Sequence, residues 1–509
     1  MPELETAAMG MPFQLGGALI EIFVFRAVVG GVTWYVAVRN TAAGEFTLIL
    51  QDIVPGVVIN AALAEANLTG LGEVTVCGAH YPLEISVTYP ANSLVLSGMG
   101  RATFLDGDAL ATNVHAIVIN GRTNCVVRDL AVQTQDGGGK TCHCIFINGF
   151  AEKLDIISVI FVASDSSAIY VQQSLESGWI MACNFEFTDD DAIFVLFNGF
   201  QVHICGNNFR SVSANAINLN SSRNSVVMDN TIYDLPAGYG IYLDACNSII
   251  VAENDISSVN NHAIMLNNSN TNIVSVNLIY VTLGSGIYLR SSPGNIIEGN
   301  QIYMPDVDGI TLTTNASFND LINNRIASAF GYGINIVTVD CSENRAMENY
   351  FEDVFSGAIN DNGTATELPE FTVYVTDPDG NIGTYPAIVL TDGVDVTVRF
   401  GVPMPDNLQE LVRARVVLVP GGTGNLRRSV STNFGKICSG EAYNTHTDSI
   451  AAGEVAVTVN ILTCIDVAAA LTNIDRGDLV GLEFTRHGSH ANDTVNANCY
   501  LLALNIQYV

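Results

Sequence analysis

The sequence predicts an all-β protein, in which a right-handed parallel β-helix is followed by a C-terminal antiparallel β-sandwich. Three observations lead to this prediction. A short strand pattern returns about every 23 to 24 residues through the middle of the chain, and an asparagine column returns at nearly the same period. Beyond the last repeat, longer alternating strands are separated by turns rich in proline and glycine. A period of this length without helical spacing predicts a solenoid of short parallel strands.

The part of the chain before the repeats divides into a β segment and a helix. Residues 1–54 are expected to form a small N-terminal β segment, because apolar residues alternate along them. Residues 58–67 have high helical propensity. Because the open end of a solenoid exposes unpaired strand edges, we expect this helix to cap the first rung. The β-helix with its cap is expected to span residues 55–365.

The repeat itself is a small residue followed by alternating large apolar and variable positions. Alternation of this kind predicts a strand with one buried face. Its copies begin at Ala116, Cys144, Ala168, Ala192, Ala216, Gly240, Ala263, Gly286, Gly309 and Gly333, and a weaker copy begins at Gly357. Residues at the same place in successive copies should therefore lie above one another, about 4.8 Å apart.

The asparagine column supports the same register. Stacked asparagine side chains can hydrogen-bond between rungs, and asparagine tolerates the left-handed backbone that a sharp corner needs. The column consists of Asn184, Asn207, Asn230, Asn254, Asn277, Asn300, Asn324 and Asn349. We expect these residues to mark one corner of every rung.

The rung pattern ends near Asp361, and a different pattern follows it. Five or more alternating strands, with turns such as Pro-Asp-Gly and Pro-Gly-Gly-Thr-Gly between them, fill residues 366–509. This layout predicts an antiparallel β-sandwich.

Composition excludes several partners. The formal net charge is -31, and lysine occurs only at Lys140, Lys153 and Lys436. Such an acidic surface repels nucleic-acid phosphates and anionic membranes. The most apolar stretch, residues 18–38, alternates and carries charges, so it predicts strands and no membrane insertion. The first residues lack a signal-peptide pattern, which favours a virion protein released by lysis over a secreted enzyme.

The predicted register brings acidic residues together at the turn before one sheet. Asp165 and Asp189 occupy the same place in adjacent rungs, so their backbones should lie about 5 Å apart. Like charges at this distance oppose joint ionisation, and one carboxyl should hold a proton. A general acid and base need this arrangement. Asp190 and Asp191 belong to the same turn and are expected to assist.

Neighbouring positions of the same turn are candidates for substrate binding: His143, Asn215 and Tyr239. Two other interpretations stay open for the aspartates. They could merely solvate a surface loop, or Asp165, Asp189 and Asp191 could bind Ca²⁺, since hard oxygen ligands suit that ion. The 11 cysteines have no Cys-x-x-Cys spacing, so they predict free thiols and no zinc site. No other cofactor is expected.

The entry of the solenoid resembles the pectate-lyase-like β-helix superfamily. The resemblance is carried by Ile59-Asn-Ala-Ala-Leu-Ala-Glu-Ala, Gly72-Glu-Val-Thr-Val-Cys-Gly-Ala-His-Tyr and Leu94-Val-Leu-Ser-Gly-Met-Gly. Glu73 and Cys77 stand where glycine and proline are usual in that superfamily. The resemblance implies the fold of residues 55–365. It does not select one function, because lyases, hydrolases, epimerases and non-catalytic viral spikes share this fold.

The segment Thr188-Asp-Asp-Asp-Ala-Ile-Phe resembles the paired-aspartate motif of the polygalacturonase family. That resemblance implies the upstream role for Asp165, and the paired role for Asp189 with Asp190 or for Asp190 with Asp191. The Gly-His-Gly element one rung later is replaced by Ala214-Asn-Ala, and the Arg-x-Lys element is missing. Whether the chain is a glycoside hydrolase, a polysaccharide lyase or no enzyme therefore stays open.

The segments before and after the solenoid resemble the head and the jelly-roll-like terminal domains of phage tailspike and fibre proteins. This resemblance implies a homotrimer that is located in a virion or is extracellular, binds a cell-surface glycan and contacts other virion or filament subunits. The leading hypothesis is therefore a tailspike-like protein that binds, and in one version hydrolyses, surface polysaccharide. The alternatives are a non-enzymatic structural subunit of a virion or extracellular filament, and a secreted Ca²⁺-dependent pectate lyase.

Overall fold

The structure is a computed structural model, and the residues that it describes are 21–40, 46–134, 141–364, 366–376, 378–405, 408–437 and 440–508. Parts of the predicted N-terminal segment, residues 1–20 and 41–45, lie outside them, as does Lys140. The chain forms two compact units. The first comprises Met1–Asn344 with Glu352–Ala365, and the second comprises Arg345–Phe351 with Thr366–Val509.

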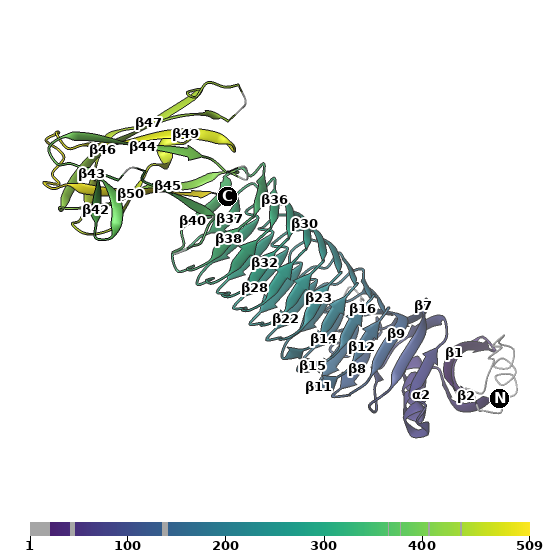
Figure 1. Ribbon diagram of the computed structural model, residues 1–509. Helices are drawn as coiled ribbons and strands as arrows, with labels where there is room; N and C mark the ends of the chain where they lie inside the picture. Colours follow the sequence, from purple (N-terminus) through teal and green to yellow (C-terminus); the bar gives the residue numbers. More distant parts are fainter. Residues whose placement is uncertain are drawn as a thin grey trace. The chain divides into compact units, whose positions relative to one another are not determined.

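The first unit is a parallel β-helix, as predicted (Figure 1). One of its walls is a parallel sheet of 12 strands within the described residues. In chain order these are β6 (Val87–Thr88), β8 (Ile117–Asn120), β10 (Ile145–Asn148), β14 (Ile169–Val171), β18 (Ile193–Val195), β22 (Ile217–Asn220), β25 (Ile241–Asp244), β28 (Ile264–Asn267), β31 (Ile287–Arg290), β34 (Ile310–Thr313), β37 (Tyr332–Ile336) and β40 (Gly357–Asp361). Ile145 pairs with Ile117 on one side and with Ile169 on the other, which confirms the predicted register.

The remaining walls belong to a sheet that has 25 strands in the described part of the chain and bends at a sharp corner in each rung. Before the corner lie β4 (Glu73–Val76), β7 (Val95–Asp106), β9 (Val126–Gln133), β12 (Asp155–Ile157), β16 (Trp179–Met181), β20 (His203–Cys205), β23 (Val226–Met228), β26 (Ile250–Ala252), β29 (Ile273–Ser275), β32 (Ile296–Glu298), β35 (Asp320–Ile322) and β38 (Arg345–Met347). After it lie β5 (Ala79–Pro82), β13 (Ile160–Ala163), β17 (Asn184–Phe185), β21 (Asn208–Arg210), β24 (Thr231–Leu235), β27 (Asp255–Val259), β30 (Leu278–Thr282), β33 (Gln301–Pro305), β36 (Arg325–Ala327) and β39 (Tyr350–Glu352). A smaller sheet contains β11 (Phe150–Glu152), β15 (Ser174–Glu176) and β19 (Gly199–Phe200).

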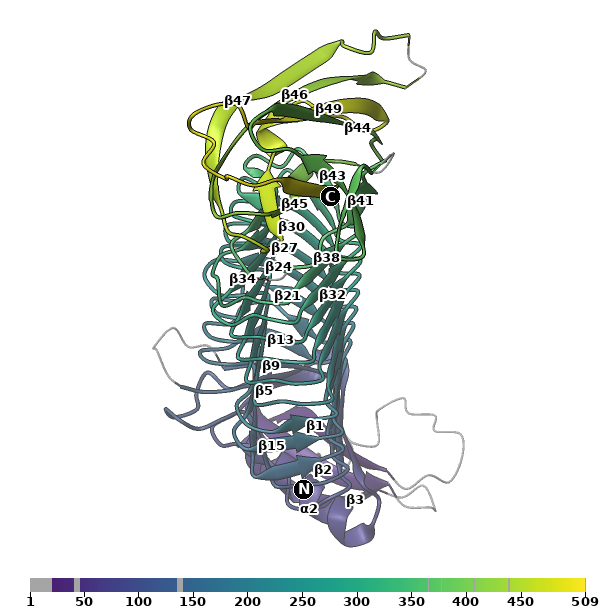
Figure 2. The ribbon, with the colours of Figure 1, turned by 60° about the vertical axis from the view of Figure 1, so that its left-hand side comes forward.

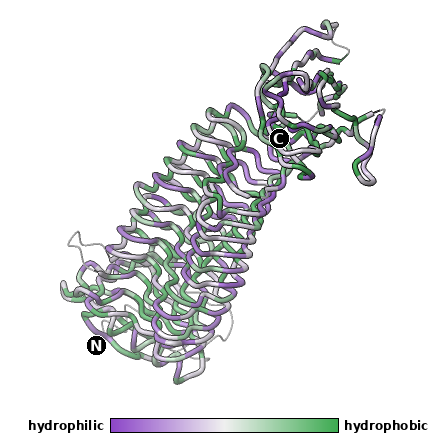
Figure 3. Tube along the Cα trace, turned by 90° about the vertical axis from the view of Figure 1, so that its left-hand side faces the viewer, coloured by the Kyte–Doolittle hydropathy of each residue, from purple (hydrophilic) through white to green (hydrophobic). Residues whose placement is uncertain are grey.

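Alternation within the strands fills the interior of the solenoid. In β10, Ile145 and Ile147 are fully buried and Phe146 points outward between them. The same alternation recurs from rung to rung, so hydrophobic and hydrophilic residues alternate along the turns (Figure 3). Inside, Phe161, Phe185 and Phe209 stack with ring centroids 4.6 Å apart, which is close to the spacing of the rungs.

Buried asparagines form a hydrogen-bonded ladder at the corner between the two rows of strands. The Oδ1 of Asn254 accepts hydrogen bonds from the backbone N–H and the Nδ2 of Asn230, at 3.1 and 2.9 Å. Its own Nδ2 donates to the Val227 carbonyl at 3.0 Å and to Asn277 Oδ1 at 2.9 Å. The same bonds connect the members of the ladder, Asn207, Asn230, Asn254, Asn277, Asn300 and Asn324.

Two details of the predicted asparagine column are wrong. The ladder position in the rung of Asn184 is held by Cys183, whose N–H donates to Asn207 Oδ1 at 2.9 Å, whereas Asn184 lies in β17 and pairs with Asn208. The prediction missed this because the step from Asn184 is one residue shorter than the rung. The left-handed backbone also falls on the residue before the ladder and not on the asparagine, as at Asp229 (φ 55°), Glu253 (φ 56°) and Val276 (φ 55°).

Helix α2 (Pro55–Thr69) covers the start of the solenoid, where the sequence predicts a cap. Asn60 replaces a missing rung: its Nδ2 donates to the Ser86 carbonyl at 2.9 Å, and its Oδ1 accepts from the Thr88 N–H at 2.7 Å. Thr88 belongs to β6, the first strand of the 12-stranded sheet. Before α2, strands β1 (Ile22–Val29), β2 (Val32–Asn40) and β3 (Phe46–Asp52) pair antiparallel, and β1 joins β4 in parallel.

The second unit contains an antiparallel sandwich, also as predicted (Figure 2). Its six-stranded sheet consists of β41 (Glu370–Tyr374), β42 (Gly380–Ile382), β43 (Tyr385–Leu390), β45 (Leu411–Pro420), β48 (Thr463–Asp466) and β50 (Cys499–Tyr508). The four-stranded sheet has the order β44 (Asp395–Pro403), β49 (Asp478–His487), β46 (Gly424–Lys436) and β47 (His446–Val457). The two sheets share one apolar core, to which Phe400, Phe434, Val416 and Leu504 contribute.

Candidate functional site

Asp165 and Asp189 occupy the same position of neighbouring rungs. The preceding residues, Ser164 and Thr188, form a parallel bridge, and the N–H of Asp189 donates to the Ser164 carbonyl at 3.0 Å. Adjacent rungs of a parallel sheet lie about 4.8 Å apart. Asp165 is half-buried, whereas Asp189 and Asp190 are exposed to solvent. Both carboxylate oxygens of Asp165 are buried, so the register provides two accessible carboxyl groups, those of Asp189 and Asp190, beside a buried one at the same turn.

A buried polar cluster lies close to the turn that carries Asp165. The hydroxyls of Thr134 and Ser164 are 3.3 Å apart, and Ser164 Oγ donates to the Ser167 carbonyl at 3.2 Å. Burial raises the pKa of the neighbouring Cys144 thiol to about 12, and the charge of Asp165 acts in the same direction. Cys144 is therefore a neutral thiol at physiological pH, and these contacts hold the turn in place.

Asp191 is buried and has structural partners. Its Oδ1 accepts hydrogen bonds from the backbone N–H of Asn215 at 2.8 Å and from Asn215 Nδ2 at 2.7 Å. Its Oδ2 accepts from Asn218 Nδ2 at 2.7 Å. Burial raises the pKa of this carboxyl to about 6, although the amide donors oppose the shift. A proton-transfer role for Asp191 would disturb hydrogen bonds that join two rungs.

Asp308 repeats this arrangement five rungs along the solenoid. Its Oδ1 accepts from the N–H of Tyr332 at 2.8 Å, and its Oδ2 accepts from Thr311 Oγ1 at 2.9 Å and Asn335 Nδ2 at 2.8 Å. The two buried carboxylates thus perform the same task, which is to bind the amide of the next rung and a side chain three residues further on.

Other residues of this turn column also accept a hydrogen bond from a backbone N–H of the following rung. His143 N–H donates to His115 Nδ1 at 3.1 Å, and Tyr239 N–H donates to Asn215 Oδ1 at 2.9 Å. The predicted binding residue Asn215 therefore uses its oxygen for Tyr239 and its nitrogen for Asp191. Its amide group is engaged by the protein on both sides.

Aromatic rings line the outward face of the 12-stranded sheet beside the acidic turn. His115 stacks on Phe146 with ring centroids 4.1 Å apart, and His143 stacks on Tyr170 at 4.5 Å. Phe194 follows Tyr170 at 5.4 Å and is tilted by 59°. Burial lowers the pKa of His115 and of His143 to about 4, so both imidazoles are neutral near pH 7.

A second group of rings lies further along the same face. Tyr239 is 5.2 Å from Tyr242 and 5.8 Å from His262, and His262 stacks on Tyr288 at 4.3 Å. Burial lowers the pKa of His262 to about 4 as well. Asn215 and Asn218 separate this second group from the first, so the face alternates between aromatic and amide surfaces.

The acidic turn and the first aromatic group lie next to each other. Burial raises the pKa of the Tyr170 hydroxyl, and the charge of Asp190 adds to the increase. Asp190 thus lies near Tyr170, which stacks on His143, and Asp165 and Asp189 belong to the same turn column. Tyr239 belongs to the second group instead.

Sequence reasoning missed most of the rings, although one position of the repeat indicates them. The third residue of each copy points outward, and it is aromatic in five copies, at Phe146, Tyr170, Phe194, Tyr242 and Tyr288. Lysine and arginine are absent from this outward position in all 12 described strands. Arg290 follows two residues after Tyr288, at the exposed end of β31.

Within the described residues, no group of three or more His, Cys, Asp or Glu side chains is arranged to hold a metal ion. Calcium binding by Asp165, Asp189 and Asp191 stays a prediction, in which Asp191 would have to exchange amide partners for the ion. No helix of the described chain is both long and apolar enough to cross a bilayer.

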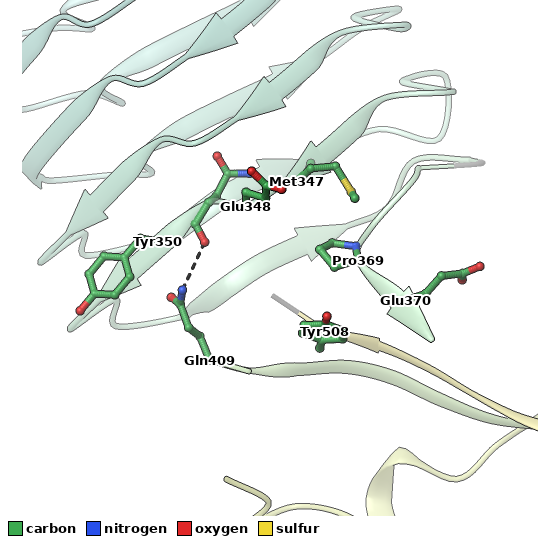
Figure 4. A pocket seen from close by; sticks show the side chains of 9 residues that line it. Met347, Glu348, Tyr350, Pro369, Glu370, Gln409 and Tyr508 are labelled. Carbon is green, nitrogen blue, oxygen red and sulfur yellow. Dashed lines mark hydrogen bonds between the residues drawn. The ribbon is translucent and has the colours of Figure 1, made fainter. Parts of the chain in front are cut away.

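The second unit contains a hollow of about 510 Å³ (Figure 4). Gln409 is anchored at its wall, since its Oε1 accepts from the Phe351 N–H at 2.7 Å and its Nε2 donates to the Asn349 carbonyl at 3.4 Å. Tyr350, Glu370 and Tyr508 also line it. The amide of Gln409 is occupied by backbone groups, so it offers little to a ligand.

Comparison with known proteins identifies the fold. The family model described as "Right handed beta helix region" matches residues 191–351. Among curated proteins, no match to this chain was found. The A-module of the mannuronan C-5 epimerase AlgE6 of Azotobacter vinelandii is similar in structure, with 17% identity, a TM-score of 0.51 and coverage of 62% of this chain and 96% of that chain. The AlgE4 A-module of the same organism has 15% identity, a TM-score of 0.48 and coverage of 62% and 96%.

A lidless DFA-IIIase of Arthrobacter chlorophenolicus A6 is also similar, with 12% identity, a TM-score of 0.40 and coverage of 61% of this chain and 89% of that chain. At these identities the similarity concerns the fold alone. The first unit is a right-handed parallel β-helix, as the sequence predicts.

Proposed function

We propose that the outward face of the 12-stranded sheet binds a polysaccharide chain. The observation that supports this proposal is the position of the acidic turn, Asp165 with Asp189 and Asp190, beside the stack of His143 and Tyr170. Half-buried rings offer apolar contact area to the C–H groups of sugars, and carboxylates accept hydrogen bonds from their hydroxyls. An enzyme with a similar fold is named for its action on mannuronan.

A solenoid face suits an extended polymer because its functional groups repeat along one direction. The two aromatic groups start at His115 and end at Tyr288, with amide side chains between them. His115 and Tyr288 lie seven rungs apart, roughly 34 Å along the sheet. This length would accommodate several sugar units in one run.

Binding is testable by affinity electrophoresis of the full chain in gels that contain alginate, dextran or galactomannan. We expect at least one polysaccharide to retard the wild-type protein. In Tyr170→Ala and Tyr288→Ala the dissociation constant should rise by about tenfold, so that retardation is weaker. Tyr280→Ala is the matched control, because Tyr280 is exposed on the 25-stranded sheet. Equal retardation of all three variants would contradict a site on the 12-stranded sheet.

Hydrolysis is the stronger version of this proposal, with Asp165 and Asp189 as the acid and base pair and Asp190 assisting. Both the predicted register and the accessibility of Asp189 support it. Measuring new reducing ends on a polysaccharide that the protein binds would test it. Wild-type activity should fall by at least 100-fold in Asp189→Asn, as expected for a general acid or base. Activity that survives this substitution would exclude the pair.

A non-enzymatic subunit is the second candidate, and one observation favours it. Asp191 and Asp308 make equivalent hydrogen bonds five rungs apart, so at least one member of the aspartate run has a structural purpose. If wild-type protein binds polysaccharide without producing reducing ends, the solenoid is a binding and structural element only.

We also propose the setting that the sequence resemblance implies: a tailspike- or fibre-like homotrimer in a virion or outside the cell. The antiparallel sandwich that follows the solenoid supports it. So does an outward row on the 25-stranded sheet that is apolar except for His203, and that a second copy could cover: Trp179, His203, Val226, Ile250, Ile273 and Ile296. Native mass spectrometry should give three copies, and a monomer in Ile250→Lys. A monomeric wild type would contradict the trimer.

A further inference from the structure

The exposed face of the four-stranded sheet in the second unit carries a hollow of about 430 Å³. This volume falls in the range of sites for small molecules, roughly 300–1,000 Å³. The residues that matter for its shape and chemistry are Arg399, Gly401, Asn433, Tyr443, Gly481 and Glu483. None of them belongs to the solenoid.

Glycines create the floor of this hollow. Gly401 of β44 pairs with Gly481 of β49, and Gly481 also pairs with Asn433 of β46. A Cβ added at Gly401 would meet nothing within 4 Å, and one at Gly481 would meet only the Asn433 carbonyl, at 3.6 Å. Two neighbouring strands therefore lack side chains at the same place, and the space above the backbone is open because of the residue type.

A tyrosine on an ordered turn lines the hollow. The ring of Tyr443 belongs to a residue that is 79% exposed. The carbonyl of Ala442 accepts hydrogen bonds from the N–H and Oγ1 of Thr445, at 3.0 and 2.8 Å. Gly435 lets this turn approach the sheet, since a Cβ there would lie 2.5 Å from the Ala442 carbonyl oxygen. The aromatic ring is thus placed beside the hollow and not covered by the protein.

The polar groups of the hollow are charge-balanced. Arg399 Nε donates to Glu483 Oε1 at 2.6 Å, so the one guanidinium and the one carboxylate form an ion pair. The side chain of Asn433 is exposed beside them and can both donate and accept. Because the pair has no net charge, it suits a neutral ligand with many hydroxyl groups.

We propose that this hollow is a second carbohydrate-binding site, specific for a neutral sugar ring. The ring lies over the backbone of Gly401 and Gly481, contacts the Tyr443 side chain with its C–H groups, and exchanges hydrogen bonds with Asn433 and the Arg399–Glu483 pair. A flat patch of backbone with one exposed aromatic ring and paired donors and acceptors matches the amphipathic surface of a sugar. This site is independent of the one proposed on the solenoid.

Saturation-transfer difference NMR on the full chain tests this proposal, with maltotetraose, cellotetraose and mannotetraose as probes. We expect transfer to the ring protons of at least one probe. Gly401→Leu puts a side chain into the open space, where its Cβ meets nothing within 4 Å, and Tyr443→Ala removes the ring. Each should raise the dissociation constant at least tenfold, whereas Tyr443→Phe should retain binding. Unchanged melting temperatures would show that the variants are folded.

Two controls separate this site from other surfaces. Thr397→Val alters the same face of β44 outside the hollow and should bind like the wild type. Tyr170→Ala, on the solenoid, should also leave this binding unchanged. The proposal is overturned if none of the three probes shows transfer, if Gly401→Leu binds normally, or if Tyr170→Ala alone abolishes the signal.

Discussion

At the scale of single residues, the corner before the asparagine ladder stores strain. Val276 has a φ of 55°, in the left-handed region that a β-branched residue enters at a cost of about 1–2 kcal/mol. Equivalent corners use Gly206, Gly299 and Asn323. The side chain of Val276 is 59% exposed and provides little packing in return.

Val276→Asn should therefore stabilise the protein by about 1 kcal/mol, because asparagine adopts this backbone region more readily. Urea titration would measure the gain. Ile273→Asn, at a nearby outward position with extended backbone, is the control and should give no increase. A lower stability in Val276→Asn would mean that the valine side chain contributes contacts that outweigh the strain.

Three histidines on the 12-stranded sheet make stability depend on pH. Burial lowers the pKa values of His115, His143 and His262 to about 4, below the ordinary value of 6.5. The unfolded chain binds more protons between these values, so folding stability is lost as the pH falls from about 6.5 to 4. Asp191 opposes this loss in the lower part of the window, since its pKa is raised to about 6 and it gains a proton in the folded state first.

His262→Asn should reduce the part of this pH dependence that the three histidines cause by about one third, because one of three similar groups is removed. His262 Nδ1 accepts a hydrogen bond from the Ser285 N–H at 2.9 Å. An asparagine side chain can accept the same hydrogen bond, because Asn215 accepts the equivalent one from the Tyr239 N–H. Free energies of unfolding measured at pH 7 and pH 4.5 would give the slope for each variant. An identical slope in both proteins would show that His262 is protonated in the folded state.

At the scale of elements, α2 completes the first rung through one side chain. Both hydrogen-bonding groups of Asn60 are used by the strand edge, at Ser86 and Thr88. Asn60→Ala removes both bonds and leaves buried or half-buried backbone groups without them, which should cost about 2 kcal/mol. It should also expose an edge that pairs with other chains.

Thermal unfolding and light scattering would measure these two effects. Asn67→Ala is the matched control, because Asn67 lies in the same helix with an exposed side chain. If both variants have the same melting temperature and light scattering, the cap depends on the apolar face of α2 and not on the hydrogen bonds of Asn60.

Much of the fold could be predicted because each rung is a local pattern repeated many times. The copies beginning at Ala116 and at Ala192 alternate in the same way, so the register and the buried face follow from the period alone. The pairing of Ser164 with Thr188 follows from the same period. The error at Asn184 arose because a column with steps of 23 to 25 residues cannot decide between neighbouring positions.

The contents of the candidate site could be predicted less well, because they depend on side-chain conformation. The period places Asp191 near Asn215, yet it does not say that Asn218 binds the other oxygen and turns the carboxylate into a structural group. The hollow above Gly401 and Gly481 could not be predicted, because it depends on the pairing of two strands whose glycines are 80 residues apart. No local sequence pattern indicates such a pairing.

At the scale of the whole molecule, the solenoid presents a long outward face with little positive charge. The outward positions of the 12-stranded sheet carry rings, amides and hydroxyls, and the chain as a whole has a net charge of -31. Long-range electrostatics would repel a polyanion, so we expect neutral polysaccharides to bind more tightly than acidic ones at low ionic strength. Gels cast with dextran and alginate at 20 mM and 200 mM salt would test this. Tighter binding of alginate at low salt would contradict it.

The central claim, a polysaccharide lying along the 12-stranded sheet, is tested most directly by hydroxyl-radical footprinting of the wild-type protein with and without a polysaccharide that it binds. Mass spectrometry reports the oxidation of each aromatic side chain. The account predicts that oxidation of Tyr170, Phe194, Tyr242 and Tyr288 falls together when the polysaccharide is present, while that of Tyr280 on the 25-stranded sheet does not change. Protection of Tyr280 with unchanged oxidation of the other four would contradict the account.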